Sequence, residues 1–337
     1  MFHGNYRIEP GGYLSHANLA QADLTIADMT MADLTEADLT EAELLGVNLS
    51  LAKLAGAKLT KVLMSGAFLP LADLTGADLQ EAFLTEVNLA QSNLTCANLA
   101  GANLAMSNLA RAQLVEANLS GAFMSGANLV SANLTRATLR AADLTGVDLT
   151  EAVLQEANLT WAHLLGANLS RANLNQAQVE DATLHQAILI AANLSQANLR
   201  KVTLTEADLN VANLAGANLS AANLTGAKLN AAFLNGARLL GAKLVRADLS
   251  GADLAEAQLN RADLTGATLT WAYLVGANLS KADLTAANLS HSDLTQADLR
   301  DANLAGANLS QARVTDQQLA QARSLEGAIL PDGVPQT

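Results

Sequence analysis

The sequence predicts a solenoid of short stacked coils around a thin apolar core, and two observations lead to this fold class. Every fifth residue from Leu14 to Val314 is Leu or a close substitute, and 56 of these 61 positions hold Leu. Two residues before each lies a smaller slot, which holds Ala at 52 of 60 positions between Ala17 and Ala312. Self-similarity at a fixed period over such a length is typical of architectures in which repeats stack on their neighbours.

The five-residue period fits neither the 3.6-residue period of a helix nor the two-residue period of a strand. The chain must therefore turn a corner in every repeat so that each Leu points inward. The companion slot stays small because a narrow interior must pack densely without clashes. The other three slots, mostly Asp or Asn, then Ser or Thr, then mixed residues, are expected to face solvent.

Glycine and proline indicate where the corners lie. All 17 glycines between Tyr13 and Leu319 occupy one slot, two residues after Leu, and the single proline there, Pro70, directly follows Leu69. A type II turn favours Pro first and a residue with positive φ, usually Gly, second. These two slots are therefore predicted to be the central residues of each corner. Corners without Gly, such as those at Glu36 and Arg171, are expected to use another turn type.

The repeat A-[DN]-L-x-x resembles the pentapeptide-repeat family, and the resemblance covers about nine-tenths of the chain. The closing segment, residues 324–333 (SLEGAILPDG), is also similar to that of many cyanobacterial-type members. The resemblance implies an all-β fold, a right-handed quadrilateral β-helix with four repeats per coil. The length of the chain then corresponds to about 15 coils.

Charge spacing offers a test of the four-repeat coil, because side chains 20 residues apart would stack about 4.8 Å from one another. Lys53 lies 20 residues from both Asp33 and Asp73, and Lys58 lies 20 residues from both Asp38 and Asp78. The same spacing relates Lys61 to Glu41 and Glu81, Arg136 to Glu116 and Glu156, and Lys228 to Asp208 and Asp248. This spacing favours four repeats per coil.

The predicted organisation has three parts. Residues 1–12 precede the repeat frame and are expected to form a short irregular cap, and residues 13–314 one uninterrupted solenoid. Residues 315–337 form a C-terminal cap, in which Thr315 and Gln318 have the spacing of a capping box. We expect a short capping helix over about 316–323 and a final strand over about 325–330, after which Pro331-Asp332-Gly333 turns the tail away.

Composition limits the classes of partner. The net charge of −13 argues against nucleic-acid binding, for which a basic face is the usual footprint. Through residue 52, eight acids accompany Arg7 alone, which either protects an open β-edge from stacking or forms an acidic docking surface. The single cysteine, Cys96, excludes a disulfide framework, and no apolar stretch has the length of a signal peptide or a membrane span. We expect a cytoplasmic protein without membrane contact.

No constellation of catalytic residues is apparent. Of the five histidines, only His163 and His185 fall near each other, and no third ligand converges on them. The carboxylates are expected on a convex surface, whereas general acid–base catalysis needs shifted pKa values in a cleft. The glycines are corner residues and form no phosphate-binding loop. The sequence thus predicts no enzyme, no metal site, no cofactor and no small-molecule substrate.

Large apolar residues in outward slots are the main departure from the repeat. Projected onto a four-sided coil, they gather on two adjoining faces, with Lys53, Lys58 and Lys61 expected on the opposite side. Such a patch either stiffens the coil stack or binds a partner or a second copy of the chain. Trp161 and Trp271 are expected to be separate surface rings. The predicted patch consists of Met31, Leu45, Leu51, Leu63, Phe68, Pro70, Leu71 and Phe83.

These observations predict a non-enzymatic scaffold whose faces bind another protein. The resemblance points to regulators such as the cyanobacterial pentapeptide-repeat proteins of cell differentiation. An alternative is an acidic DNA mimic that acts on a type II topoisomerase, as in the quinolone-resistance members. Those proteins tend to have Phe in the central slot, a break in the coil and a dimerising C-terminal module. Here no central slot holds Phe and the repeat frame is unbroken.

Overall fold

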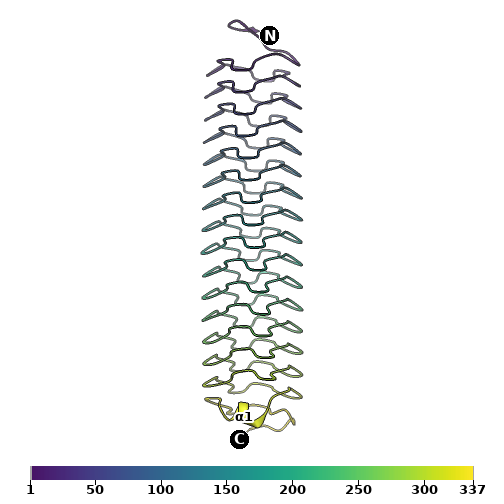
Figure 1. Cartoon of the computed structure of the whole chain (residues 1–337), viewed down its shortest axis with the longest axis vertical. Coiled ribbons are helices and arrows are strands. Elements are labelled where there is room, and N and C mark those ends of the chain that lie inside the picture. Colours follow the sequence, from purple (N-terminus) through teal and green to yellow (C-terminus); the bar gives the residue numbers. More distant parts are fainter. Residues whose placement is uncertain (1, 337) are drawn as a thin grey trace. The chain divides into compact units, whose positions relative to one another are not determined.

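A computed structural model describes residues 2–336, which divide into two compact units, Met1–Ala172 and Asn173–Thr337. The sequence predicts one uninterrupted solenoid, and the repeat frame does continue through the boundary between the units. Within each unit the chain forms successive coils joined by parallel β-bridges (Figure 1). Helix and strand are scarce in the described residues: β1 (Phe2–His3), β2 (Tyr6–Arg7) and α1 (Asp316–Leu319).

The coil contains four repeats, because each bridge joins residues 20 positions apart. Tyr13 pairs with Asp33 in the first unit, and Asn173 pairs with Asn193 in the second. Three backbone hydrogen bonds per repeat link one coil to the next, as from Leu14 N–H to the Asp33 carbonyl (2.7 Å). The predicted charge pairs form at this spacing. Salt bridges join Lys53 to Asp33 (3.9 Å), Lys58 to Asp38 (3.9 Å), Arg136 to Glu116 (2.7 Å) and Lys228 to Asp208 (3.8 Å).

The core consists of the Leu and Ala slots, which are almost entirely inaccessible to solvent in both units. The slot for Asp or Asn has a specific local role. In Asp23, for example, Oδ1 accepts a hydrogen bond from Thr25 N–H (3.1 Å), and Asn98 or Asn118 accepts similarly from the residue two positions later. This bond satisfies the backbone N–H of the first turn residue, which explains why short polar side chains dominate the slot.

Each corner is a tight turn closed by a hydrogen bond from the Ala slot to the preceding Leu carbonyl, as from Ala17 N–H to Leu14 (3.0 Å). The second central residue has positive φ at corners with and without Gly: 54° at Glu36, 58° at Arg171 and 60° at Gly46. Positive φ at this position alone is the type II pattern. The expectation that corners without Gly use another turn type is therefore wrong, because the coil-to-coil hydrogen bonds impose one backbone path on all corners.

The N-terminal cap is more regular than predicted. β1 and β2 pair antiparallel, with Phe2 opposite Arg7 and His3 opposite Tyr6. The Tyr6 hydroxyl accepts a hydrogen bond from Asn18 N–H (3.3 Å), a group that has no preceding coil to pair with. Ile8 is buried beneath the first coil. The hairpin thus covers the open edge of the first unit.

The C-terminal cap differs from the prediction in three ways. α1 ends at Leu319 rather than near residue 323, because the Gln321 carbonyl already accepts from Asp301 N–H (3.0 Å) in the preceding coil. The segment 325–330 forms no continuous strand: Ser324 and Ile329 make single bridges to the preceding coil. The tail does not turn away. It folds back, with Gln336 N–H donating to the Ala328 carbonyl (2.7 Å).

Candidate functional site

The apolar patch, defined as the eight predicted residues, belongs to the first unit. Leu63 and Phe83 are direct bridge partners in adjacent coils, and Phe68 lies between Asn48 and Asn88 in the next column of the same unit. Met31, Leu51 and Leu71 occupy the same corner in three successive coils, and Leu51 N–H donates to the Pro70 carbonyl (3.1 Å). Pro70 and Leu63 are half-buried, whereas the other six patch residues are 39–61 % exposed.

The aromatic and aliphatic residues of the patch replace a locally stabilising group. Leu63, Phe68 and Phe83 stand in the slot where Asp or Asn normally accepts the N–H of the first turn residue. At Phe68 that donor is absent, because the first turn residue is Pro70, which has no N–H. At Leu63 and Phe83 the N–H groups of Ser65 and Thr85 remain, and the apolar side chains offer them no acceptor. Turn stability therefore does not explain these substitutions.

The structure adds residues to the predicted patch. Ile26 is 81 % exposed, and its Cγ2 lies 3.7 Å from where a Cβ of Gly46 would be, beside Leu45. The signal for Ile26 is present in the sequence, as a branched apolar residue in a corner slot. Two further exposed residues of the first unit, Met106 and Phe123, follow the same rule.

The position of Lys61 differs from the prediction. Lys61 lines a hollow of about 360 Å³ together with Phe83, Asn103 and Phe123, so it borders the patch instead of lying opposite it. Its ammonium pairs with Glu81 (3.7 Å), which lines the same hollow. The prediction was wrong because Lys61 occupies a corner slot, which faces both adjoining sides of a coil. One edge of the patch is therefore charged.

The two tryptophans have partners within their own units. The Arg140 guanidinium lies over the Trp161 ring, 4.1 Å from its centroid, and Trp271 stacks on His291 with centroids 4.2 Å apart and planes 5° from parallel. They are therefore not isolated surface rings. Both contacts join neighbouring coils and contribute to coil-to-coil packing.

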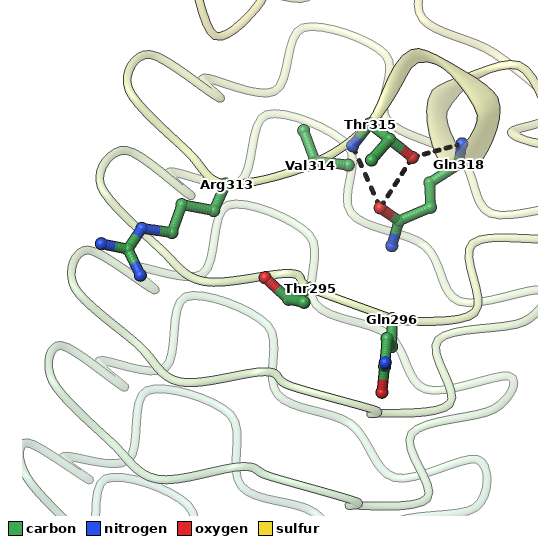
Figure 2. Close-up of a pocket in the computed structure, with 6 residues that line it drawn as sticks. All are labelled: Thr295, Gln296, Arg313, Val314, Thr315 and Gln318. Carbon is green, nitrogen blue, oxygen red and sulfur yellow. Dashed lines mark hydrogen bonds between the residues drawn. The ribbon is translucent and has the colours of Figure 1, made fainter.

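A hollow at the C-terminal cap has a structural explanation. It measures about 530 Å³ and is lined by Thr295, Gln296, Arg313, Val314, Thr315 and Gln318 (Figure 2). Thr315 and Gln318 are engaged in the capping box of α1, with Thr315 N–H donating to Gln318 Oε1 (3.0 Å). Arg313 is paired with Asp293 (3.4 Å). These side chains are committed to closing the second unit.

The described residues contain few features of a catalytic or metal centre. Within residues 2–336, no three His, Cys, Asp or Glu side chains are grouped closely enough to hold a metal ion. Cys96 is exposed, with its Sγ 3.7 Å from Glu116 Oε2. None of the helices in the described part of the chain is long and apolar enough to cross a membrane.

The coils and their regular bridges define a repeat protein with interaction surfaces on its coil faces. Thirteen segments between residues 11 and 316 match the family model described as "Pentapeptide repeats (8 copies)". The chain belongs to the pentapeptide-repeat family.

Among solved structures, the chain is similar to HetL, a pentapeptide repeat protein involved in heterocyst differentiation regulation from the cyanobacterium Nostoc sp. strain PCC 7120. The identity is 36 %, over 77 % of this chain and 91 % of HetL, with a TM-score of 0.35. It is also similar to QnrB1, a plasmid-mediated fluoroquinolone resistance protein, at 19 % identity over 57 % of this chain and 92 % of that one, with a TM-score of 0.31. A search of curated proteins finds no match.

Proposed function

We propose that this protein is a non-enzymatic scaffold that binds another protein through the apolar patch. The observation that supports this proposal is the replacement of the turn-stabilising Asp or Asn by Leu63, Phe68 and Phe83 within adjoining coils. Exposed aromatic and branched side chains supply most of the binding energy in typical protein interfaces. Each of them also gives up a local hydrogen bond or depends on a proline, so a use outside the fold is the simplest reason for their presence.

The proposed role is regulatory, by sequence similarity to HetL over most of both chains. The single exposed cysteine fits a reducing compartment, so we place this activity in the cytoplasm. The finer architecture that we propose is the right-handed, quadrilateral form of the family, with about 15 coils.

The test is the triple variant Leu63→Asn, Phe68→Asn and Phe83→Asn, which restores the residue type that is common in this slot. We expect the circular dichroism spectrum to be retained and capture of the natural partner by the tagged protein to be lost. The matched control is Leu165→Thr, which changes an equally exposed residue four coils from Phe83 and restores the residue found at Thr145. Unchanged capture by the folded triple variant would contradict the proposal.

Light scattering of the same variants distinguishes a second copy of the chain from a different protein as the partner. If the parent protein is oligomeric and only the triple variant is monomeric, the patch joins two copies of this chain. If both have the same mass, the patch serves a different protein.

A second candidate function is supported by the charge of the first unit. Asp23, Asp28, Asp33 and Asp38 place one carboxylate on each of four successive repeats. Such a charged ring is compatible with an acidic DNA mimic that acts on a type II topoisomerase. A gyrase supercoiling assay tests this function: relief of quinolone inhibition by the protein supports it, and absence of any effect at micromolar protein excludes it.

A further inference from the structure

Two hollows in different units share one design, in which two aromatic side chains flank a short polar residue. In the first unit the column Phe83, Asn103 and Phe123 lines the hollow described above. In the second unit the column Phe233, Asp253 and Tyr273 lines a hollow of about 460 Å³. The flanking rings are attached two coils apart, about 9–10 Å, which leaves room for one inserted side chain.

The second hollow, here called the Asp253 notch, combines aromatic walls with a carboxylate. Phe233 and Tyr273 are 51 % and 57 % exposed, and Ala255 and Val275 complete an apolar border. Gly251 also lines the notch, and a side chain there would meet nothing within 4 Å, so the entrance is open. A cation held midway between the rings would lie within the approximately 6 Å at which cation–π attraction operates.

The carboxylate of Asp253 has no basic partner of its own. Its Oδ1 accepts the Ala255 N–H (3.0 Å), and among residues 2–336 no Lys or Arg side chain forms an ion pair with it. Farther along the same column, Asp293 pairs with Arg313 in the next coil (3.4 Å). Where this column supplies an arginine, the aspartate binds it. At Asp253, the adjacent coils present aromatic rings instead.

We propose that the Asp253 notch binds a basic side chain, preferentially arginine, presented by a partner protein. The planar guanidinium stacks on aromatic faces and pairs with a carboxylate, which the smaller and more strongly hydrated ammonium of lysine does less well. The complementary charges of the notch and the guest set the chemistry of the partner: an exposed arginine on a basic surface. This surface lies in the second unit and is independent of the apolar patch in the first.

The experiment uses the full chain with ¹³C-labelled Phe and Tyr rings, observed by NMR. The probes are N-acetyl-arginine methylamide, the corresponding lysine compound and the neutral isostere N-acetyl-citrulline methylamide. We expect the arginine compound to shift the ring signals of Phe233 and Tyr273 saturably, the lysine compound to bind several-fold more weakly, and the citrulline compound to bind at least tenfold more weakly. Added salt weakens binding of both cations.

The variant Asp253→Asn removes the charge and keeps the turn. Asn103, in the matching place of the first unit, accepts the Ala105 N–H (3.1 Å) just as Asp253 accepts that of Ala255, so the fold tolerates either residue. We expect at least a tenfold loss of affinity for the arginine compound. Tyr273→Asn, which removes one wall, provides a second variant with the same expected direction.

The notch of the first unit is an internal control, because its central residue is neutral. The signals of Phe83 and Phe123 should shift far less than those of Phe233 and Tyr273. Equal shifts with arginine and citrulline, equal shifts in both notches, or full binding by Asp253→Asn would each overturn the proposal. Because the probes are small molecules, none of these outcomes bears on the apolar patch.

Discussion

At each corner one residue adopts a left-handed backbone whatever its side chain. This conformation costs roughly 1–2 kcal/mol for residues other than Gly, yet Glu36, Trp161 and Lys281 all have φ between 54° and 62°. The corner N–H groups form part of the ladder between coils, as from His16 N–H to the Thr35 carbonyl (2.9 Å). The hydrogen bonds of the ladder therefore offset the local backbone cost, and the corner slot is free to accept residues chosen for the surface.

The three serines of the Ala slot give a prediction at the same scale. The hydroxyls of Ser92 and Ser292 each donate to a Leu carbonyl (2.7 Å), whereas the buried Ser107 Oγ has no hydrogen-bond partner. An unsatisfied buried hydroxyl costs about 1–3 kcal/mol. We expect Ser107→Ala to raise the free energy of unfolding by about 1 kcal/mol in denaturant titration. Ser92→Ala is the control and should leave stability unchanged or slightly lower; equal effects of the two changes would refute the explanation.

At the scale of the element, α1 shows how a side chain replaces a backbone group. In regular coils the residue of the Asp or Asn slot donates its N–H to the Ala carbonyl 21 positions earlier, as Asp298 does to Ala277 (2.9 Å). Gln318 stands in this slot, but its N–H is used within the helix. Its side-chain Nε2 donates to the Ala297 carbonyl instead (2.9 Å), and to that of Leu294 (2.7 Å).

This replacement predicts that Gln318 stabilises the cap mainly as a donor. Gln318→Ala should lower the free energy of unfolding by about 1–3 kcal/mol, since two carbonyls and the capping box lose a partner. Gln318→Glu keeps the capping acceptor but not the donor, so it should cost nearly as much. Gln317→Ala, at an exposed site, serves as the control. Hydrogen exchange at the last coil is the measurement, and a harmless Gln318→Glu would show that the donor role is unimportant.

At the scale of the whole molecule, stability should depend on pH through the aspartates that close the turns. Hydrogen bonds from the hydroxyls and then the backbone N–H groups of Thr30, Thr35 and Thr40 lower the pKa values of Asp28, Asp33 and Asp38 from the ordinary 3.8. A carboxyl with a depressed pKa in the folded state contributes stability above its unfolded pKa. That contribution disappears as the pH falls through the folded pKa.

We therefore expect a constant melting temperature from pH 7 to about 5 and a fall below about pH 4. Changing Thr30, Thr35 and Thr40 together to Ala, a residue that this slot accepts at Ala20 and Ala55, removes the strongest donors and should make the fall shallower. An unaltered acid profile in this variant would exclude the threonine hydroxyls as its cause.

The sequence predicts the repeating interior well and the ends poorly, for a physical reason. The Leu and Ala slots, the corners and the 20-residue charge pairs recur throughout, so a single rule describes them. The hairpin at Tyr6 and the short α1 instead satisfy hydrogen-bonding groups left open by an absent neighbouring coil, which no period reveals. Similarly, the apolar residues of the patch stand out against the repeat. The pairing of Asp253 with two rings becomes apparent only when residues 40 apart are aligned as one column.

The 20-residue ladder also constrains how the gene can change in length. Losing five residues would preserve the Leu and Ala frame, but every residue downstream would move by one corner, so that Phe83 would no longer face Leu63. Losing 20 residues returns each downstream side chain to its former column. Inheritance should therefore tolerate deletions and duplications of whole coils where the surface has a function, and of single repeats only where the surface has none.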